Sequence, residues 1–401
     1  MIKAILSGRA SRGIIALMFG AFGIGMTEFI VAGLLPDISK DFHISITTAG
    51  LLVSAYATGV AIGAPLITAL SGKYNRKYLL IALMLVFVAG NLLAAMAFNY
   101  PLLLAARILA SLTHGTFFGV GAVVATRLVP KDKGAAAIAM MFTGLTAANV
   151  AGVPLGTFIG QHFGWRIPFW IVSIVGVITL LLLYKLLPSM PIRELPQLRS
   201  EFKALKRLPV LLGLGMTLFG YGGLFAVFTY IAPILTTYAD LDGNGVSAML
   251  VIFGIGLVLG NIVGGKWADR HLLRTLLVSF VSLTTMLLIS MAVIHSLVTA
   301  AIMVFLLGFT GFLMVSGVQL LIVREAIQAP HIASAFNISA FNVGITLGSL
   351  VGGAVIESRF GLSGVGVAGA LVTAVAVLLV VWQWRIQATN KNDPDNWSRQ
   401  Q

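Results

Sequence analysis

Long apolar runs alternate with short polar stretches along the whole chain. A run of about 20 apolar residues is long enough to cross the roughly 30 Å hydrocarbon core of a bilayer as a helix. We therefore expect an all-α, multi-pass membrane protein. The pattern predicts twelve spans, near residues 14–36, 48–71, 78–97, 101–126, 135–160, 167–188, 210–236, 246–268, 273–293, 297–322, 331–355 and 363–385.

The composition supports this prediction and narrows the chemistry. Of the 401 residues, 58% are hydrophobic and 10% are charged, whereas soluble domains have about 25% charged residues. The first run, Ile14–Pro36, is too long for a cleaved signal peptide, and no small-residue cleavage site follows it. The absence of cysteine excludes disulfides and thiolate metal sites, and we expect no cofactor.

Lysine and arginine are concentrated at the termini and in alternate loops. The opposite loops hold Lys40, Arg166 and Arg359, and Arg107 lies inside a run. Because positive charge marks the cytoplasmic side of a membrane protein, both termini are expected in the cytoplasm, which requires an even number of spans. The net charge of +13 then faces anionic lipid headgroups, so it does not require a nucleic-acid partner.

An internal repeat predicts two bundles of six helices. Shifting the sequence by 197 residues lays the segment 63–80 over 260–277, and Pro36 over Pro233. A long polar interval rich in proline and basic residues separates the two copies. The predicted parts are an N-terminal bundle (1–190), a cytoplasmic linker (191–209) and a C-terminal bundle with a short polar tail (210–401).

Glu28 is the one carboxylate that lies well inside an apolar run. An ionised carboxylate at that depth costs at least about 2–3 kcal/mol, so Glu28 is expected to face a partner, water or a proton. With a rise of about 1.5 Å per residue, Glu28 lies roughly 12 Å and Arg107 roughly 9 Å from the outer ends of their runs. We therefore predict that the two side chains pair. His114 lies on the helix face of Arg107, about two turns closer to the cytoplasm.

These three residues suggest a proton-coupling site. Glu28 is expected to take a proton while it faces outside and to release it to the cytoplasm when substrate arrives. Burial favours a protonated carboxylate and a nearby cation favours an ionised one, so a conformational change that alters either moves the proton. Histidine titrates near neutral pH, so His114 can relay or sense protons. The alternatives are a static Glu28–Arg107 salt bridge and a His114 that only packs between helices.

Polar and aromatic residues near mid-span are the candidates for a substrate pocket, because most small-molecule sites combine apolar walls with a few polar groups. Each of them can equally well pack between helices. No second carboxylate lies at mid-membrane depth, so neutral or amphipathic substrates are favoured over strongly cationic ones. The candidates are Tyr56, Asn149, Tyr221, Phe225, Tyr230, Asn337 and Asn342.

The chain resembles the major facilitator superfamily over nearly its whole length. The resemblance rests on the short basic loops after the second and eighth runs, on the Arg107 segment, and on Gly152-Val153-Pro154-Leu155-Gly156 in the fifth run. It implies two six-helix bundles related by a pseudo-two-fold axis, which rock about a central site. Thr27-Glu28-Phe29 and His114-Gly115 are similar to the drug:proton antiporter-1 branch, in particular to its arabinose, sugar and purine-nucleoside efflux subgroup.

The resemblance also implies gating residues, a location and partners. Pro154, inside a run, is expected to kink its helix. The implied location is the bacterial inner (plasma) membrane, where the chain is expected to act as a monomer with a small-molecule substrate, protons and membrane lipids as partners. The expected gating residues are Arg76, Lys77, Asp269, Arg270, Gly152, Pro154 and Gly156.

We expect a secondary transporter and not an enzyme. The sequence contains no HExxH motif and no phosphate-cradling loop with a lysine, and no Ser/His/Asp set is placed at membrane depth. The preferred function is proton-coupled efflux, by alternating access, of small neutral or amphipathic molecules such as drugs, sugars or nucleosides. A proton-coupled importer or facilitator has the same architecture. A channel fits less well, because a buried ion pair within a repeat suits a carrier.

Overall fold

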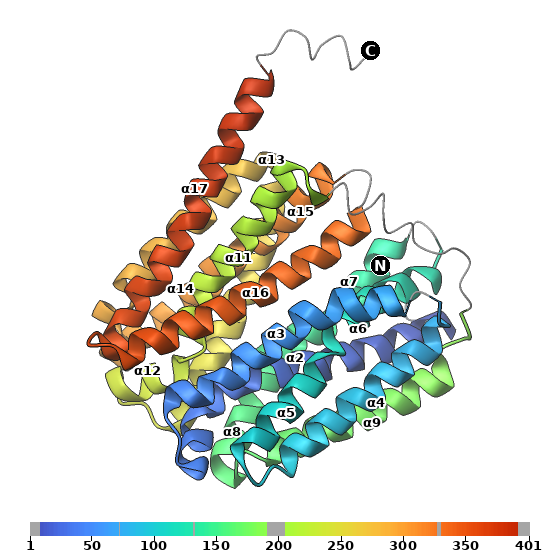
Figure 1. Ribbon diagram of the computed structural model, residues 1–401, viewed down its shortest axis with the longest axis horizontal. Helices are drawn as coiled ribbons and strands as arrows, with labels where there is room; N and C mark the ends of the chain where they lie inside the picture. The colour runs from blue at the N-terminus through green and yellow to red at the C-terminus, as the bar shows by residue number, and fades with distance from the viewer. Residues whose placement is uncertain (1–8, 72, 131–132, 191–204, 327–329, 392–401) are drawn as a thin grey trace.

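The computed structural model describes residues 9–71, 73–130, 133–190, 205–326 and 330–391, which form helices and no strands (Figure 1). Eleven helices in this part of the chain are long and apolar enough to cross a membrane. The longest, α13 (Gly243–Val293), has 51 residues and a non-helical backbone at His271 (φ −142°, ψ 66°). Because this break divides α13 into two spans, the prediction of twelve spans is confirmed.

The first bundle contains six spans, of which the fourth and fifth are interrupted. Ser45 and Asn99 begin two of the helices, because each side chain accepts a hydrogen bond from a backbone N–H of the first turn. The helices are α2 (Arg9–Phe42), α3 (Ile46–Leu70), α4 (Arg76–Ala95), α5 (Tyr100–Ser111) with α6 (His114–Arg127), α7 (Gly134–Ala147) with the π-helical η2 (Ala148–Gly152) and α8 (Val153–Phe163), and α9 (Ile167–Leu186).

The second bundle repeats this arrangement with its own capping residues. Asp242 caps α13, and Ser296 forms a capping box with Thr299. The fourth span of this bundle is broken at Met314, much as the fourth span of the first bundle is broken between Ser111 and His114. The remaining helices are α11 (Leu208–Phe228) with α12 (Ile231–Tyr238), α14 (Leu297–Leu313) with α15 (Val315–Glu325), α16 (Pro330–Glu357), the 3₁₀ turn η3 (Gly361–Gly364) and α17 (Val365–Lys391).

The architecture of two six-helix bundles agrees with the prediction, and Figure 1 shows them as two groups of helices. Most of the predicted linker, residues 191–204 of 191–209, lies outside the described residues. Within the second bundle, α13 and α14 approach closely at Gly256, Gly260 and Gly264, where a Cβ atom would collide with the backbone of α14. Small residues at this four-residue spacing are a common way to pack helices tightly in a bilayer.

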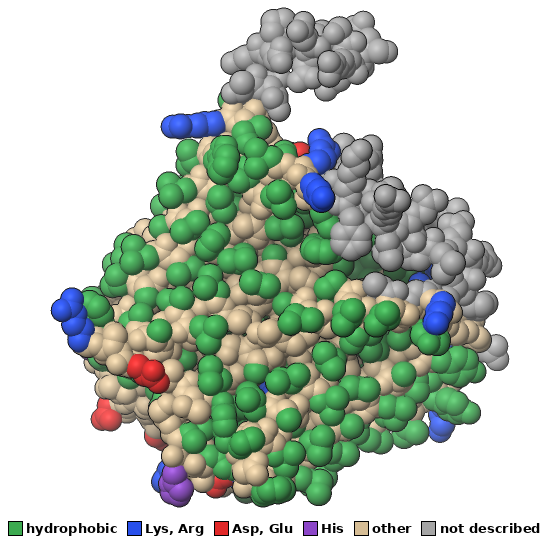
Figure 2. Space-filling model, in the orientation of Figure 1, with side chains coloured by type: hydrophobic (Ala, Val, Ile, Leu, Met, Phe, Trp, Pro, Cys, Tyr) green, Lys and Arg blue, Asp and Glu red, His purple; other side chains and the backbone are tan. Residues whose placement is uncertain are grey.

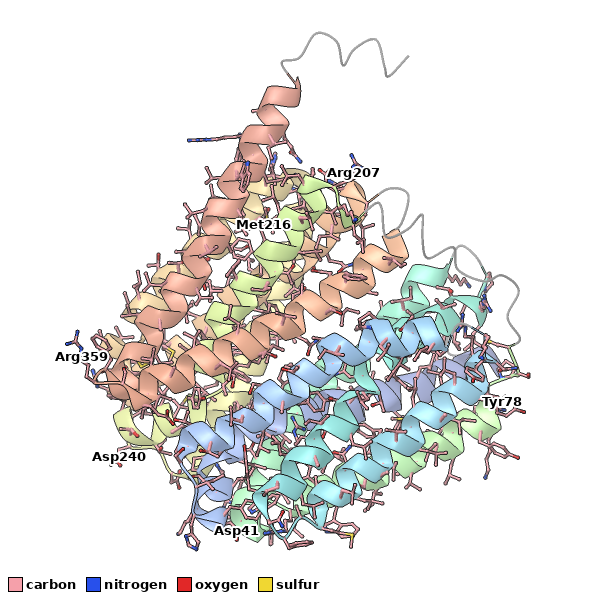
Figure 3. All side chains as sticks on the ribbon, viewed as in Figure 1. Asp41, Tyr78, Arg207, Met216, Asp240 and Arg359 are labelled. Carbon is pink, nitrogen blue, oxygen red and sulfur yellow. The ribbon has the colours of Figure 1, made fainter. Side chains whose placement is uncertain are left out.

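Charged side chains gather at the two ends of the bundles, and hydrophobic side chains cover the face between them (Figure 2). Tyr78 and Arg207 lie at one end, and Asp41, Asp240 and Arg359 lie at the other (Figure 3). We call these the basic end and the opposite end. The basic end carries Lys73, Arg76, Lys77, Arg127, Arg207, Lys266, Arg270, Arg274 and Arg324, whereas the opposite end carries Lys40, Arg166 and Arg359.

Candidate functional site

The two bundles meet along α3 and α16, which lie side by side (Figure 1). The hydroxyl oxygens of Thr58 and Thr346 are 3.1 Å apart. Near the opposite end, the Ser247 hydroxyl donates to the side-chain oxygen of Gln161 across 3.3 Å. Within the described part of the chain, every hydrogen bond between the bundles lies between mid-membrane and the opposite end. In the described part of the chain, the hydrogen-bonded interface between the bundles therefore lies in that half of the molecule.

Glu28 lies on α2, with its side chain 10% exposed. Its Oε2 is 3.9 Å from Nδ1 of His114 on α6. This distance is too long for a hydrogen bond, but it allows an ion pair when the imidazole is protonated. Tyr56 on α3 places its hydroxyl oxygen 3.4 Å from the same Nδ1 atom. The structure thus brings together two of the predicted proton-coupling residues and one of the predicted pocket residues.

Arg107 on α5 is buried, with 1% of its surface exposed, and it is held by the backbone of neighbouring spans. Its guanidinium donates to the carbonyl oxygens of Thr27 (2.5 Å) and Glu28 (3.3 Å) on α2, and more weakly to that of Leu52 (3.5 Å) on α3. Its Cζ lies 4.1 Å from the centroid of the Tyr56 ring, a cation–π contact. Arg107 therefore joins three spans.

The predicted pairing of the Glu28 and Arg107 side chains is wrong. No ion pair joins the two side chains among the described residues, although Arg107 binds the main chain of Glu28. The reason lies in the donors of the guanidinium, which presents five N–H groups in a planar fork. Carbonyl oxygens of two spans and the face of Tyr56 meet this demand without a carboxylate. The carboxylate of Glu28 faces His114 instead.

Two contacts of this site were not predicted from the sequence. The Thr27 hydroxyl donates to Asn91 Oδ1 on α4 across 2.6 Å, and the Asn91 amide donates to the Phe87 carbonyl oxygen across 2.8 Å. Asn91 is a polar residue inside the apolar run 78–97, and this position could have indicated a buried hydrogen-bond partner. We call the assembled group the N-bundle cluster; it consists of Thr27, Glu28, Tyr56, Asn91, Arg107 and His114.

Aromatic side chains of the second bundle face the N-bundle cluster through Phe29, the residue after Glu28. The centroid of the Phe29 ring lies 5.8 Å from that of Phe225 and 6.2 Å from that of Phe228, both on α11. Tyr221 stacks on Phe225 at 5.7 Å. The sequence predicted Tyr221 and Phe225 as pocket residues, but the chain has 24 phenylalanines and no spacing distinguishes the others that gather here. We call this group the aromatic cluster; it consists of Tyr221, Phe225, Phe228, Phe253, Phe312 and Phe341.

Comparison with known proteins identifies the family. The family model described as Major Facilitator Superfamily matches residues 17–340. The chain belongs to this superfamily. It is 43% identical over 374 residues to the inner membrane transport protein YdhP of Escherichia coli K12, covering 93% of this chain and 96% of that protein. It is 34% identical over 380 residues to a chloramphenicol resistance protein of Streptomyces lividans, with coverage of 93% and 96%.

The fold of the superfamily is also found in a solved structure. A bacterial homologue of the human lysosomal transporter Spinster, in an inward-facing and unoccupied conformation, matches with a TM-score of 0.77 at 16% identity, covering 97% of this chain and 99% of that one. At this identity the match concerns the fold alone. Together with the transporter relatives, the family makes the protein a multi-pass membrane transporter and not an enzyme.

The other predicted pocket residues lie in helix contacts. The Tyr230 hydroxyl donates to the Ser349 carbonyl oxygen across 3.0 Å. The side-chain amide of Asn149, on η2, donates across 3.1 Å to the carbonyl oxygen of Leu145, one turn earlier on α7. The amide of Asn342 bonds within α16, while its Oδ1 has no partner among the described residues.

Asn337 belongs to a neutral polar network of the second bundle. It is fully buried, its Oδ1 accepts from the Thr217 hydroxyl (2.6 Å), and its amide donates to Gln319 (2.6 Å). Gln319 in turn donates to the hydroxyl of Ser334 across 2.8 Å. We call these four residues the C-bundle network. Its contacts hold α11, α15 and α16 together, so Asn337 has a structural partner on two other spans.

The predicted gating residues of the first basic loop bind within their own bundle. The Arg76 guanidinium lies 3.5 Å from the Ser71 carbonyl oxygen, and the Lys77 ammonium donates to the Tyr184 carbonyl oxygen across 2.7 Å. In the second bundle, Asp269 and Arg270 are exposed immediately before the break at His271.

The predicted kink at Pro154 takes the form of a π-helical turn. Residues 148–152 form η2, and Pro154 stands in the first turn of α8, directly after it. Irregular turns of this kind are frequent at functional sites of helices. Gly152 and Gly156 lie against α2, since a Cβ atom on them would meet Phe22 and Ile30 respectively.

Proposed function

We propose that the protein exports small neutral or amphipathic molecules in exchange for protons, with Glu28 as the proton-carrying group. The observation that carries this proposal is the position of the Glu28 carboxylate, 3.9 Å from a titratable imidazole and one residue from the contact between the bundles. A carboxylate locked to an arginine has little reason to change its charge. A carboxylate that faces His114 can exchange a proton with it or share one.

Arg107 supports this role as a fixed charge. It is bound to the main chain of Glu28 and not to its carboxylate, so it stays in place whichever protonation state the carboxylate has. Burial favours the protonated carboxylate and a nearby cation favours the ionised one. A small movement that changes the hydration of Glu28 therefore changes its proton occupancy, and coupling needs nothing more.

The cycle follows from the sidedness that we propose. If the basic end faces the cytoplasm, as the distribution of lysine and arginine favours, both termini are cytoplasmic and the contacts at the opposite end close the outer side. The described conformation then corresponds to inward access. We propose that the polar interval 191–209 links the two bundles. When the bundles rock, the Thr58–Thr346 contact breaks and Glu28 becomes accessible from the outside, where it takes a proton.

The aromatic cluster is the proposed substrate surface. Stacked and edge-on rings offer area to flat or amphipathic molecules, and no second mid-membrane carboxylate faces it within the described residues. A relative is named for chloramphenicol resistance, which makes chloramphenicol the first compound to test. We propose that the monomer is the working unit and that the bacterial inner membrane is its location.

The alternative is a proton-coupled importer, which has the same architecture. The experiment that separates the two is transport into proteoliposomes under an imposed pH gradient, with chloramphenicol, sugars and nucleosides as candidates. An antiporter accumulates substrate on the acidic side of the membrane and a symporter on the alkaline side. Saturable counterflow without a gradient is expected for both carriers, whereas unsaturable flux would point to a channel and end the proposal.

A further inference from the structure

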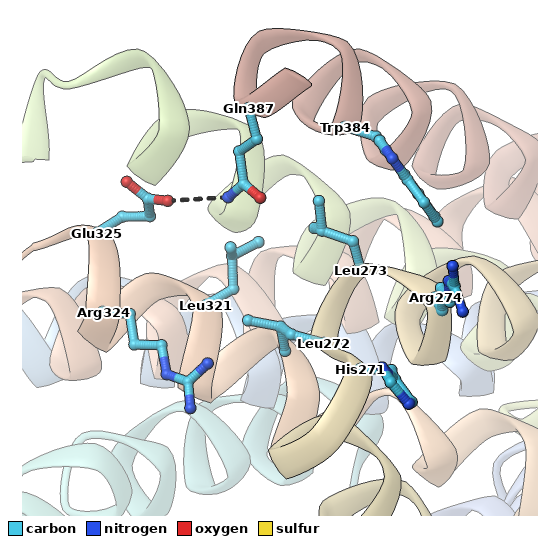
Figure 4. Close-up of a pocket in the computed structure, with 9 residues that line it drawn as sticks. All are labelled: His271, Leu272, Leu273, Arg274, Leu321, Arg324, Glu325, Trp384 and Gln387. Carbon is cyan, nitrogen blue, oxygen red and sulfur yellow. Dashed lines mark hydrogen bonds between the residues drawn. The ribbon is translucent and has the colours of Figure 1, made fainter. Parts of the chain in front are cut away.

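A cavity of about 400 Å³ opens at the basic end of the second bundle and includes no residue of the N-bundle cluster. Figure 4 shows the residues that line it. Three segments that are distant in the sequence form its walls: the turn of α13 after its break, the end of α15, and the last part of α17. The polar and aromatic side chains that line it are His271, Arg274, Arg324, Glu325, Trp384 and Gln387.

The two arginines of this cavity have no partner in the described part of the chain. Among the described residues, neither Arg274 nor Arg324 makes an ion pair or a hydrogen bond through its side chain. The one carboxylate of the cavity, Glu325, accepts a hydrogen bond from Gln387 across 3.2 Å, as Figure 4 shows, and not from an arginine. Within the described ranges, the two guanidinium groups that line the cavity therefore lack a counter-ion.

A second observation indicates that a polar ligand or water reaches this region. Gln383 lies one helical turn before Gln387, on the same face of α17, and is fully buried. Neither its amide nitrogen nor its carbonyl oxygen has a partner in the described part of the chain. Buried amides are nearly always satisfied by protein, water or ligand, and Gln387, one turn further on, lines the cavity.

We propose that this cavity binds a phosphate group, either of an anionic phospholipid headgroup or of a free phosphate. Guanidinium groups match the oxygens of phosphate in geometry and charge, and unpaired ones lose least on binding them. The cavity lies where helices end at the membrane surface, and Trp384, with the exposed Trp382, has the position of a tryptophan anchored at the interface. A headgroup bound here ties α15 and α17 to the turn that joins the eighth and ninth spans.

The test measures binding of short-chain phosphatidylglycerol to the detergent-solubilised full chain by native mass spectrometry. Phosphatidylcholine of the same chain length and inorganic phosphate serve as comparison ligands. An arginine that contacts the headgroup is expected to contribute about a factor of five to its binding, so Arg274→Gln with Arg324→Gln is expected to weaken phosphatidylglycerol binding on the order of 30-fold. Arg324→Gln alone is expected to weaken it about fivefold and is used if the double variant does not fold.

The matched control is Arg270→Gln, which removes the same charge from the same turn but from a residue that does not line the cavity. Because its guanidinium does not line the cavity and is screened by solvent, it is expected to stay within about twofold of the parent chain. Competition by inorganic phosphate assigns the site to free phosphate as well, and its absence assigns the site to the lipid headgroup; both support a phosphate site. Unchanged phosphatidylglycerol binding in the cavity variants, or an equal loss in Arg270→Gln, overturns the proposal.

Discussion

Each bundle buries a polar group of residues, and the two groups differ in charge. The N-bundle cluster contains an arginine, a glutamate and a histidine, whereas the C-bundle network consists of Thr217, Gln319, Ser334 and Asn337. In the network, Asn337 uses both ends of its amide. In the cluster, the carboxylate of Glu28 makes no hydrogen bond among the described residues, and its one ion-pair contact there is with His114, 3.9 Å away.

This difference in charge suggests different roles for the two groups: one stabilises its bundle, and the other can change its protonation state. A neutral network with satisfied donors and acceptors has one favourable arrangement and makes a bundle rigid. A carboxylate beside an imidazole has more than one protonation state, so its arrangement can change with pH and access. The comparison therefore predicts that proton coupling belongs to the first bundle, and that the second bundle contributes rigidity and the aromatic cluster.

The largest expected effect comes from linking the two bundles covalently. The chain has no cysteine, so Thr58→Cys with Thr346→Cys introduces a single pair at a site where the hydroxyls are 3.1 Å apart. Oxidation is expected to stop transport completely, and a reductant is expected to restore it. The control is Thr68→Cys with Thr116→Cys, whose hydroxyls are 3.4 Å apart within the first bundle. Equal inhibition by both cross-links would mean that the bundles do not separate at Thr58.

Arg107→Ala is expected to have the next largest effect, on stability. The substitution removes the buried group that joins three spans and leaves a void over Tyr56. A loss of about 1–3 kcal/mol is expected, because buried carbonyl oxygens lose their donor. The measurement is the thermal midpoint in detergent, read by size-exclusion chromatography. Arg107→Lys is expected to recover only part of the loss, because an ammonium lacks the planar fork; full recovery would show that only the charge matters.

Tyr221→Ala is expected to weaken substrate affinity without affecting coupling. Removal of a ring that contacts Phe225 and Phe341 is expected to raise KM about tenfold, while the dependence of transport on the pH gradient stays. Tyr221→Phe keeps the ring and is expected to stay within about twofold. Loss of the pH dependence in Tyr221→Ala, at unchanged KM, would place coupling in the second bundle as well.

Asn337→Ala is expected to have the smallest effect. Side-chain hydrogen bonds between membrane helices contribute about 0.6 kcal/mol on average and up to about 1.7 kcal/mol, so a modest fall in thermal midpoint is expected. Transport of the folded fraction, normalised to protein that elutes as a monodisperse peak, should keep its pH dependence. A variant that folds normally but transports without a pH response would contradict the purely structural role assigned to the C-bundle network.

The fold was predictable because a bilayer imposes a simple length rule on apolar runs. The twelve spans follow from it, including the two that run together in α13. The partners of Arg107 were not predictable, because the carbonyl oxygens that it binds belong to the backbone and carry no mark of residue type. The sequence pointed to the right buried charges and to a wrong contact between them.

The fourth span shows a second limit. The sequence predicted it as one continuous run, but it is broken between Ser111 and His114. Arg107 and His114 nevertheless face the same neighbours, since both contact Tyr56 on α3 and Glu28 on α2. The aromatic cluster shows a third limit, since its members come from four helices and share no spacing along the chain.

The most direct test of the central claim is transport by Glu28→Gln in proteoliposomes, with Glu357→Gln as a control that removes an exposed carboxylate at the opposite end. Accumulation driven by a pH gradient and counterflow without a gradient are measured on the same preparations. We predict that Glu28→Gln loses gradient-driven accumulation and keeps its counterflow, while Glu357→Gln keeps both. Full gradient-driven accumulation by Glu28→Gln would show that the proton is carried elsewhere and would contradict the account.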